Sequence, residues 1–227
     1  MDYNGILMHH YSGSDFLCHH GIKGQKWGIR RFQNSDGSLT AAGKERYLSN
    51  TQVNSAAKAI SELYKTINSF EYGTIINGKR YGEEELSEVD WSKYRTIPIE
   101  TIKKEKIGNC WDFVNYQHSE LDKAGIPNKN YMFVMARSDA PDDIVTHTFT
   151  IASIGNQNKW IESAMWSKRG IHDVSGPENV VKILSSVYGE GAYDLYEFNP
   201  DGMDNGLTDK EYFSKATASD PILQRHK

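Results

Sequence analysis

The chain has 227 residues, of which 38% are apolar, and its mean hydropathy is −0.64. This length allows one well-buried domain with extensions. No run of about 18 apolar residues occurs, so we expect no membrane span. The net charge of −4 argues against general nucleic-acid binding by the whole chain. The first residues lack a basic segment followed by a hydrophobic one, so we expect no signal peptide.

Residues 1–50 differ in composition from the rest. Five potential metal ligands gather there, at His9, His10, Cys18, His19 and His20. Thiolate and imidazole groups suit zinc, which keeps a zinc site open as an interpretation. Adjacent histidines rarely bind one ion together, however, and we predict neither a metal nor a cofactor.

A basic, glycine-rich stretch follows, with Trp27 between Lys26 and the pair Arg30-Arg31. Such residues can contact phosphates and stack on bases, but we favour a solvated arm or a protein-docking peptide. From His19 to Tyr47 the sequence resembles a module of virion and head-associated proteins of phages of Gram-positive bacteria. Its pattern is H-H-G-x-K-G-x-K-W-G-x-R-R and then N-x-D-G-x-L-T-x-x-G-K-x-R-Y. The resemblance implies that residues 19–47 dock on a phage capsid or carrier protein, and that the protein resides in the bacterial host cytoplasm, the virion or both.

Residues 51–90 are expected to form a helical linker region. Apolar residues at helical spacing predict a helix over 51–70, with its N-cap among Ser49, Asn50 and Thr51. The Asn77-Gly78 pair predicts a hairpin across 73–82. The acidic run that starts at Glu83 predicts a short solvated helix or loop.

The core domain is expected over 91–200, followed by a polar tail over 201–227. Helices are predicted over 110–125 and 177–189, and strands over 131–135, 146–154, 159–164 and 193–198. This order predicts an α+β fold. The second helix is expected to turn Val180, Val181, Ile183, Leu184 and Val187 inward. In the tail, Thr208 and Glu211 predict a capping box for one short helix.

Three residues of this domain have the local sequence that a thiol catalytic triad needs. Cys110 follows Gly108-Asn109 at the start of a helix, where the dipole and free N–H groups can lower a thiol pKa to roughly 3.5–7.5. His147 lies on an alternating strand and Glu162 on the next one, as a base and its orienting acid would. The oxyanion hole is expected to use the N–H of Cys110, with that of Trp111 as a further candidate.

Each of these residues also has a structural interpretation. A lone cysteine at a helix start is often a small buried residue, and the histidine and glutamate could simply be packed or solvated strand residues. The occurrence of all three roles in chain order favours catalysis. Asp112, in the first helical turn, is expected to cap the helix. A disulfide between Cys18 and Cys110 would disable the nucleophile, so we expect a reducing compartment.

The segment from about Lys106 to Phe198 resembles the transglutaminase-like cysteine hydrolases, a branch of the papain-like superfamily. The resemblance is carried by G-x-C-W-D, T-H-T-F, W-x-E-x-x-x-W and R-G-I-H. It implies an antiparallel sheet packed on the nucleophile helix, with the N-terminal segment as an extension. It also implies catalysis by Cys110, His147 and Glu162. The side chains expected to bind substrate are Trp111, Trp166, Arg169 and His172.

Two departures from that family stand out. The acid is glutamate where transglutaminases usually have aspartate, and no glutamine precedes the cysteine as an oxyanion donor. The expected function is a phage-associated hydrolase of peptide, isopeptide or other amide bonds in a protein or peptide substrate. The alternatives are a protein-glutamine transferase and a non-catalytic phage structural protein.

Deleting residues 1–47 is expected to leave core folding and Cys110 reactivity nearly unchanged, because a segment with few periodic apolar residues contributes little to a core. The truncated protein should lose its association with phage particles or another carrier. Thermal unfolding and thiol labelling of the full-length and truncated proteins test this. A large fall in Tm contradicts separability, and a jump in labelling rate indicates an autoinhibitory segment.

Overall fold

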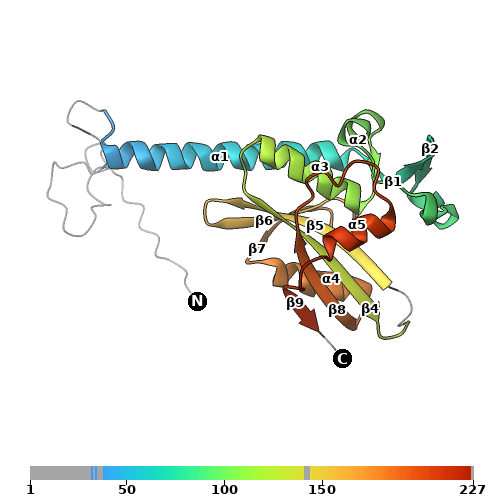
Figure 1. Ribbon diagram of the computed structural model, residues 1–227. Helices are drawn as coiled ribbons and strands as arrows, with labels where there is room; N and C mark the ends of the chain where they lie inside the picture. The colour runs from blue at the N-terminus through green and yellow to red at the C-terminus, as the bar shows by residue number, and fades with distance from the viewer. Residues whose placement is uncertain (1–31, 33, 35–37, 141–143, 226–227) are drawn as a thin grey trace, which may run out of the picture. The chain divides into compact units, whose positions relative to one another are not determined.

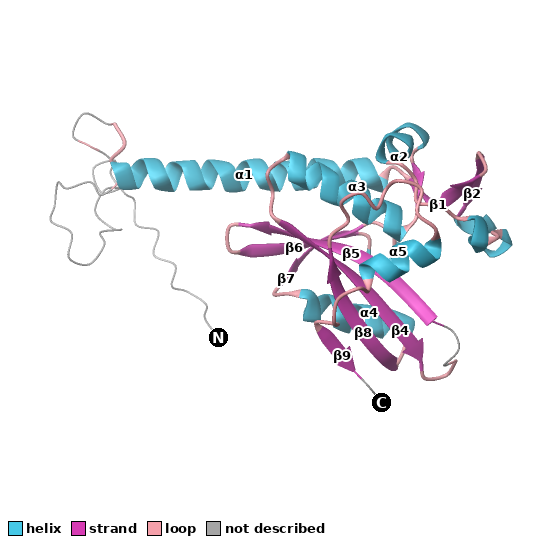
Figure 2. Ribbon diagram, in the orientation of Figure 1, coloured by secondary structure: helices cyan, strands magenta, loops and turns pink. Residues whose placement is uncertain are grey.

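The computed structural model describes residues 32, 34, 38–140 and 144–225, and all structural statements concern this part of the chain. The chain divides into two compact units, Met1–Leu48 and Ser49–Lys227. The second unit contains an antiparallel sheet with the strand order β7-β6-β5-β4-β8-β9 (Figures 1 and 2). Its strands are β4 (Asn128–Arg137), β5 (Ile144–Ile154), β6 (Gln157–Glu162), β7 (Gly170–Val174), β8 (Gly191–Phe198) and β9 (Leu223–Arg225). The predicted α+β class is confirmed.

A smaller sheet lies beside the start of α3. In it, β1 (Glu71–Ile76) pairs antiparallel with β2 (Lys79–Gly82) and parallel with β3 (Ile107–Gly108). The α-helices are α1 (Ala41–Asn68), α2 (Ile99–Glu105), α3 (Cys110–Lys123), α4 (Pro177–Tyr188) and α5 (Asp209–Ala216). Short 3₁₀ helices are η2 (Glu83–Glu88), η3 (Trp91–Lys93) and η4 (Trp166–Lys168). In the described chain, no helix is both long and apolar enough to span a bilayer.

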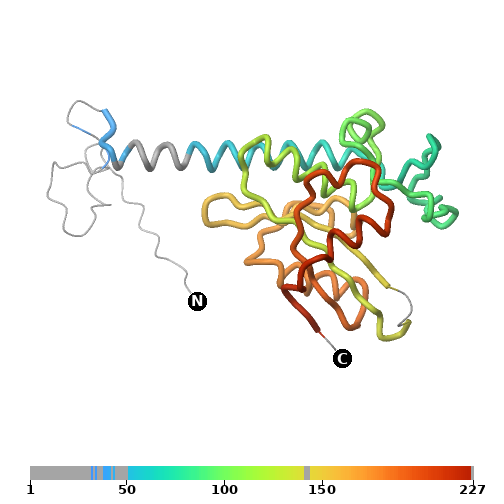
Figure 3. Tube along the Cα trace, viewed as in Figure 1, coloured from blue at the N-terminus to red at the C-terminus, as the bar shows by residue number. Residues whose placement is uncertain are grey.

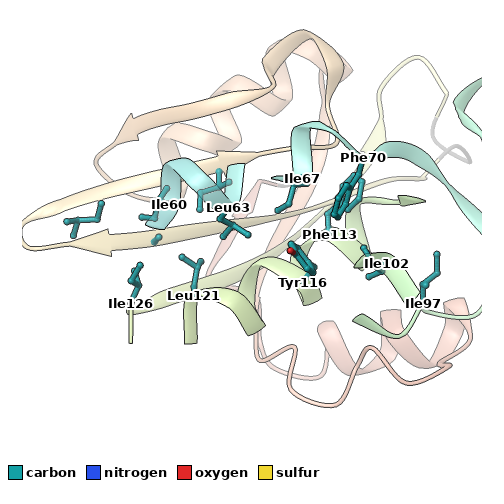
Figure 4. Close-up of a cluster of buried hydrophobic side chains, with 13 residues drawn as sticks. Ile60, Leu63, Ile67, Phe70, Ile97, Ile102, Phe113, Tyr116, Leu121 and Ile126 are labelled. Atoms are coloured by element: carbon teal, nitrogen blue, oxygen red, sulfur yellow. The ribbon is translucent and has the colours of Figure 1, made fainter. Parts of the chain in front are cut away.

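Apolar side chains cover both faces of the large sheet. Residues of α1 and α3 form a core on one face (Figure 4), and residues of α4 form a core on the other. Strand β5 supplies Ala152 and Ile154 to the first core and Phe149 and Ile151 to the second, as the two-residue period of a strand requires. Burying one large aliphatic or aromatic side chain stabilises a fold by about 1.5–3 kcal/mol. Since several such side chains are buried on each face, both cores stabilise the sheet.

The helix expected over 51–70 is longer than predicted, and its predicted start is wrong. Helix α1 begins at Ala41, where the Thr40 hydroxyl accepts a hydrogen bond from the Gly43 N–H at 3.1 Å. The helix starts ten residues before the predicted start at 51, because apolar periodicity marks only the part of a helix that packs on a core. The region expected as a linker also contributes to the first core, through Ile60, Leu63, Ile67 and Phe70.

Most of the other predicted elements are confirmed. Asn77 and Gly78 have φ values of 51° and 79°, as a two-residue type I′ hairpin needs. Helix α3 ends just before Gly125, which has φ 66°. Helix α4 buries Val180, Val181 and Leu184, but the inward assignment of Val187 is wrong, because this residue of the last turn is 40% exposed.

Strands β7 and β9 were not predicted. The C-terminal segment, expected as a polar tail, packs on the core domain and adds a strand to the sheet. Figure 3 shows it leaving β8, crossing to the side of α3 and returning to the sheet at β9. Leu207 and Gly206 bond to Thr96 on the way, and Tyr212 of α5 stacks on Trp111 with ring centroids 4.7 Å apart. The predicted capping box at the start of α5 is confirmed.

The start of α3 is held by a buried capping box, as predicted for Asp112. The Asn109 side chain accepts from the Trp111 and Asp112 N–H groups, and the Asp112 carboxylate accepts from the Asn109 N–H at 3.2 Å. The same carboxylate accepts from the Ile97 N–H at 2.8 Å and from the Tyr94 hydroxyl at 3.0 Å. Burial raises the pKa of Asp112 to about 7, against the lowering effect of these hydrogen bonds.

Asp112→Ala should lower the free energy of unfolding by about 3 kcal/mol, because it leaves buried donors without an acceptor. Urea unfolding monitored by circular dichroism measures this. Asp220→Ala, at an exposed loop position, is the matched control and should change stability by no more than about 0.5 kcal/mol. Equal losses in the two variants would contradict a structural role for the box.

Candidate active site

Cys110 is the first residue of α3 and lies directly after β3. The backbone before Cys110 passes close to α3 at Gly108. A Cβ at this position would lie 3.0 Å from Asp112 Cβ and from Phe113 Cε1, so a larger residue would push these side chains aside. The capping box described above fixes the backbone on both sides of the cysteine. The Cys110 side chain is buried, with 8% of its surface exposed.

His147 and Glu162 form a buried hydrogen-bonded pair on neighbouring strands. His147 Nε2 lies 2.9 Å from Glu162 Oε2, and the side chains are 3% and 2% exposed. The other carboxylate oxygen, Oε1, accepts from the N–H groups of Ala164 and Met165, both at 2.7 Å. These three contacts fix the carboxylate and therefore the plane and the tautomer of the imidazole.

The structure brings the Cys110 thiol to this pair. The thiol and the His147 ring lie close enough for each to shift the pKa of the other, and since Nε2 faces Glu162, Nδ1 is the nitrogen left for the sulfur. Burial alone would raise the pKa of Cys110, but the hydrogen bond and the charge of His147, with a bond from the Thr148 backbone, lower it below the ordinary value. Burial would lower the pKa of His147, but Glu162 and Cys110 together raise it to about 10. Both shifts favour a thiolate–imidazolium pair.

The end of β6 makes room for the cysteine. The β5–β6 ladder runs from the Thr150–Ile161 pair to the hairpin, so the edge of β5 is not paired with β6 at Thr148. The Thr148 backbone contacts the sulfur there. Below His147, the ring of Tyr188 lies with its centroid 6.2 Å from the imidazole, and burial raises the Tyr188 pKa above its ordinary range.

A pocket of about 450 Å³ opens over the thiol. It is lined by residues of five segments, namely Tyr72, Trp91, Asn109, Cys110, Trp111, Ile144, Thr146 and Asp209. Of the four side chains expected to bind substrate, Trp111 is the one in this lining. Sequence reasoning missed Tyr72 and Trp91, which lie far along the chain from the motifs that carry the triad. It also missed Ile144, although this residue lies two positions before the T-H-T-F motif.

Trp166 and Arg169 line a separate pocket of about 420 Å³, together with Phe70, Glu71, Tyr72 and residues 82–85. Trp166 is 71% exposed, and the Arg169 guanidinium lies 4.5 Å from its ring centroid. His172 is in neither lining. Its Nε2 lies 2.7 Å from the Lys168 carbonyl oxygen, and its ring packs on Trp160 with centroids 4.8 Å apart. The structure therefore places His172 away from the thiol pocket.

One of the two expected oxyanion donors is already used. The Trp111 N–H donates to Asn109 Oδ1 at 2.9 Å, so it is not free to bind an oxyanion, and that expectation is wrong. Asn is a preferred N-cap residue, and its position directly before the helix was the signal for this role, which the expectation for Trp111 did not take into account. The Cys110 N–H remains as a donor at this helix end.

A cluster on the opposite end of α3 has the composition of a metal site. His118 Nε2 lies 3.5 Å from Asp122 Oδ2 and 3.2 Å from Asp201 Oδ1. Asn128 Oδ1 lies 2.8 Å from His118 Nδ1, so the imidazole already has polar partners on both nitrogens. The histidine-rich segment before residue 21, considered above for zinc, lies outside the described residues.

Comparison with known proteins identifies no family for this chain. No family model and no curated protein matches the chain. Among solved structures, LapG of Legionella pneumophila is similar at 14% identity and a TM-score of 0.38, over 79% of this chain and 88% of that chain. A superposition this loose supports no conclusion about function, so the functional proposals depend on the geometry of the site.

The ion pair predicts an unusual pH dependence for alkylation of Cys110 by iodoacetamide. In a Cys18→Ser background, the rate constant should stay nearly constant from about pH 7 to 9, because the thiolate already exists below the ordinary thiol pKa of about 8.5. It should fall only at lower pH. In His147→Ala, no imidazole offsets the effect of burial, which raises the pKa of Cys110. The alkylation rate constant of this variant should therefore keep rising with pH, up to pH 8.5 or above. Identical profiles in the two proteins would contradict the ion pair.

Proposed function

We propose that the protein is a cysteine hydrolase that cleaves peptide, isopeptide or side-chain amide bonds of a protein or peptide substrate. The observation that carries this proposal is the buried His147–Glu162 pair beside the Cys110 thiol, with Cys110 in the lining of an open pocket. The sequence of roles is nucleophile, base and orienting acid. A buried structural cysteine would need none of these partners.

The reaction follows from this geometry. The Cys110 thiolate attacks the substrate carbonyl carbon, a C–S bond forms, and the carbonyl π electrons move to oxygen. The tetrahedral intermediate collapses, the C–N bond breaks, and the His147 imidazolium gives its proton to the leaving amine or ammonia. A thioester remains. His147 then takes a proton from water, the hydroxide attacks the thioester, and the C–S bond breaks to release the acid and restore the thiolate.

Glu162 serves as the orienting acid in place of the aspartate usual in transglutaminases. Its longer side chain reaches His147 Nε2 while Oε1 bonds to two backbone N–H groups of the turn after β6. Because three donors hold the carboxylate, it can stabilise the imidazolium without itself taking the proton. The substitution of glutamate for aspartate is therefore compatible with catalysis.

We also propose a transglutaminase-like arrangement for residues 91–200. The supporting features are a nucleophile at the start of α3 and its base and acid on adjacent antiparallel strands β5 and β6. Helix α3 packs on the same sheet through Phe113, Tyr116 and Leu121. Docking of residues 19–47 on a phage particle or carrier protein is a separate proposal, which rests on the sequence pattern of that module.

The triad residues should contribute unequally. Cys110→Ala should abolish activity, and His147→Ala should lower it by about 10³-fold or more. Glu162→Gln should cost less, since the carboxylate orients the imidazole and does not react. His172→Ala is the matched control and should retain activity within a few-fold, because its ring lies away from the thiol pocket. A His147→Ala variant with unchanged activity would contradict the mechanism.

The reaction type can be determined without knowing the natural substrate. Wild-type protein and Cys110→Ala are incubated with a bacterial lysate, and new protein N-termini are identified by mass spectrometry. Ammonia release and incorporation of dansylcadaverine are measured in parallel. New N-termini indicate a peptidase, ammonia alone an amidase, and amine incorporation a glutamine transferase. None of the three, together with a slowly labelled Cys110, would identify a non-catalytic protein.

A further inference from the structure

The oxyanion hole of the proposed hydrolase lacks a second donor. Acyl transfer is commonly assisted by two donors directed at the developing negative charge on the carbonyl oxygen. Of the first three N–H groups of α3, those of Trp111 and Asp112 both donate to Asn109 Oδ1, at 2.9 and 3.2 Å. Only the Cys110 N–H is left at this helix end, so another group must supply the second hydrogen bond.

Tyr72 is placed to supply it. Strand β1 pairs in parallel with β3, with Tyr72 opposite Gly108, two residues before the cysteine. The Tyr72 ring packs against Phe113 with centroids 6.3 Å apart, which fixes its direction. It lines the pocket over the thiol together with Cys110, and burial and the neighbouring Cys110 thiol both raise the pKa of its phenol.

The position of Tyr72 along the surface supports the same role. It is the one residue that lines both the thiol pocket and the neighbouring pocket of Trp166 and Arg169, among the pockets found in the described chain. An extended substrate that occupied both pockets would pass over Tyr72, next to the carbonyl that Cys110 attacks.

The tyrosine is also kept in the donor form. Burial and the neighbouring Cys110 charge raise the pKa of Tyr72 well above its ordinary value, so the phenol is neutral and protonated around neutral pH. A neutral donor stabilises an oxyanion without drawing the thiolate into a permanent ion pair. The hydroxyl needs to donate a hydrogen bond only, and its proton stays on the phenol throughout.

We infer that the Tyr72 hydroxyl is the second oxyanion-hole donor of this site, acting with the Cys110 backbone N–H; the inference rests on the hydrolase function proposed above. As the thiolate attacks, the carbonyl oxygen accepts one hydrogen bond from this N–H and a second from the Tyr72 O–H.

Two small reagents separate this role from thiol reactivity. p-Nitrophenyl acetate acylates Cys110 through a tetrahedral oxyanion, whereas iodoacetamide alkylates the same sulfur by direct displacement without one. Both rate constants are measured in a Cys18→Ser background for Tyr72→Phe. The ratio of acylation to alkylation should fall by about 10²-fold, the effect of removing one oxyanion-hole donor. Tyr81→Phe, on the neighbouring strand β2, should leave the ratio unchanged within about twofold.

Each other result overturns a specific claim. An unchanged ratio in Tyr72→Phe shows that the hydroxyl is not a donor, and a raised ratio shows that it obstructs the site; both refute the inference while Cys110 remains a nucleophile. Slow reaction of the wild-type thiol with both reagents, insensitive to His147→Ala, refutes the proposed hydrolase function and the inference with it.

Discussion

The buried capping box at the start of α3 is the constraint on which the site depends. The Asp112 carboxylate joins the start of α3 to the loop between η3 and α2, because it accepts hydrogen bonds from Asn109 before α3 and from Tyr94 and Ile97 of that loop. These contacts leave the helix start with one geometry relative to β3. Cys110 is the first helical residue, so the capping box sets the position of its sulfur near the edge of β5 independently of His147.

The second constraint is the register of β5 and β6. Because side chains alternate along a strand, His147 shares its face of the sheet with Phe149 and Ile151, and Glu162 shares that face with Trp160. The apolar residues of this face pack on α4. The His147–Glu162 pair is therefore placed by the same burial that fixes the sheet, and a one-residue slip would turn both side chains to the opposite face.

Local patterns were sufficient to predict much of this arrangement. The cap and helix at Cys110, the two strands that carry His147 and Glu162, the hairpin at Asn77-Gly78 and the capping box of α5 all depend on residues within a few positions of one another. Tyr72 could not be found in this way, because its place in the pocket depends on the parallel pairing of β1 with β3. Strand β7 was missed for a similar reason, since it is defined by its pairing with β6 more than by its own sequence.

The electrostatics of the site explain why hydrogen-bond donors are so prominent in it. A Cys110 thiolate, a His147 imidazolium and a Glu162 carboxylate sum to one negative charge in a buried space, where an uncompensated charge is costly. No lysine or arginine occurs in the described lining of the thiol pocket, and Asp209 adds a further acid. The compensation must come from dipoles. Glu162 is stabilised by two backbone N–H groups, and the sulfur by the start of α3 and the Thr148 backbone. In the proposed mechanism, dipoles fixed in this way need not reorganise when charge moves from sulfur to a substrate oxygen, so the same groups that stabilise a thiolate would also suit an oxyanion.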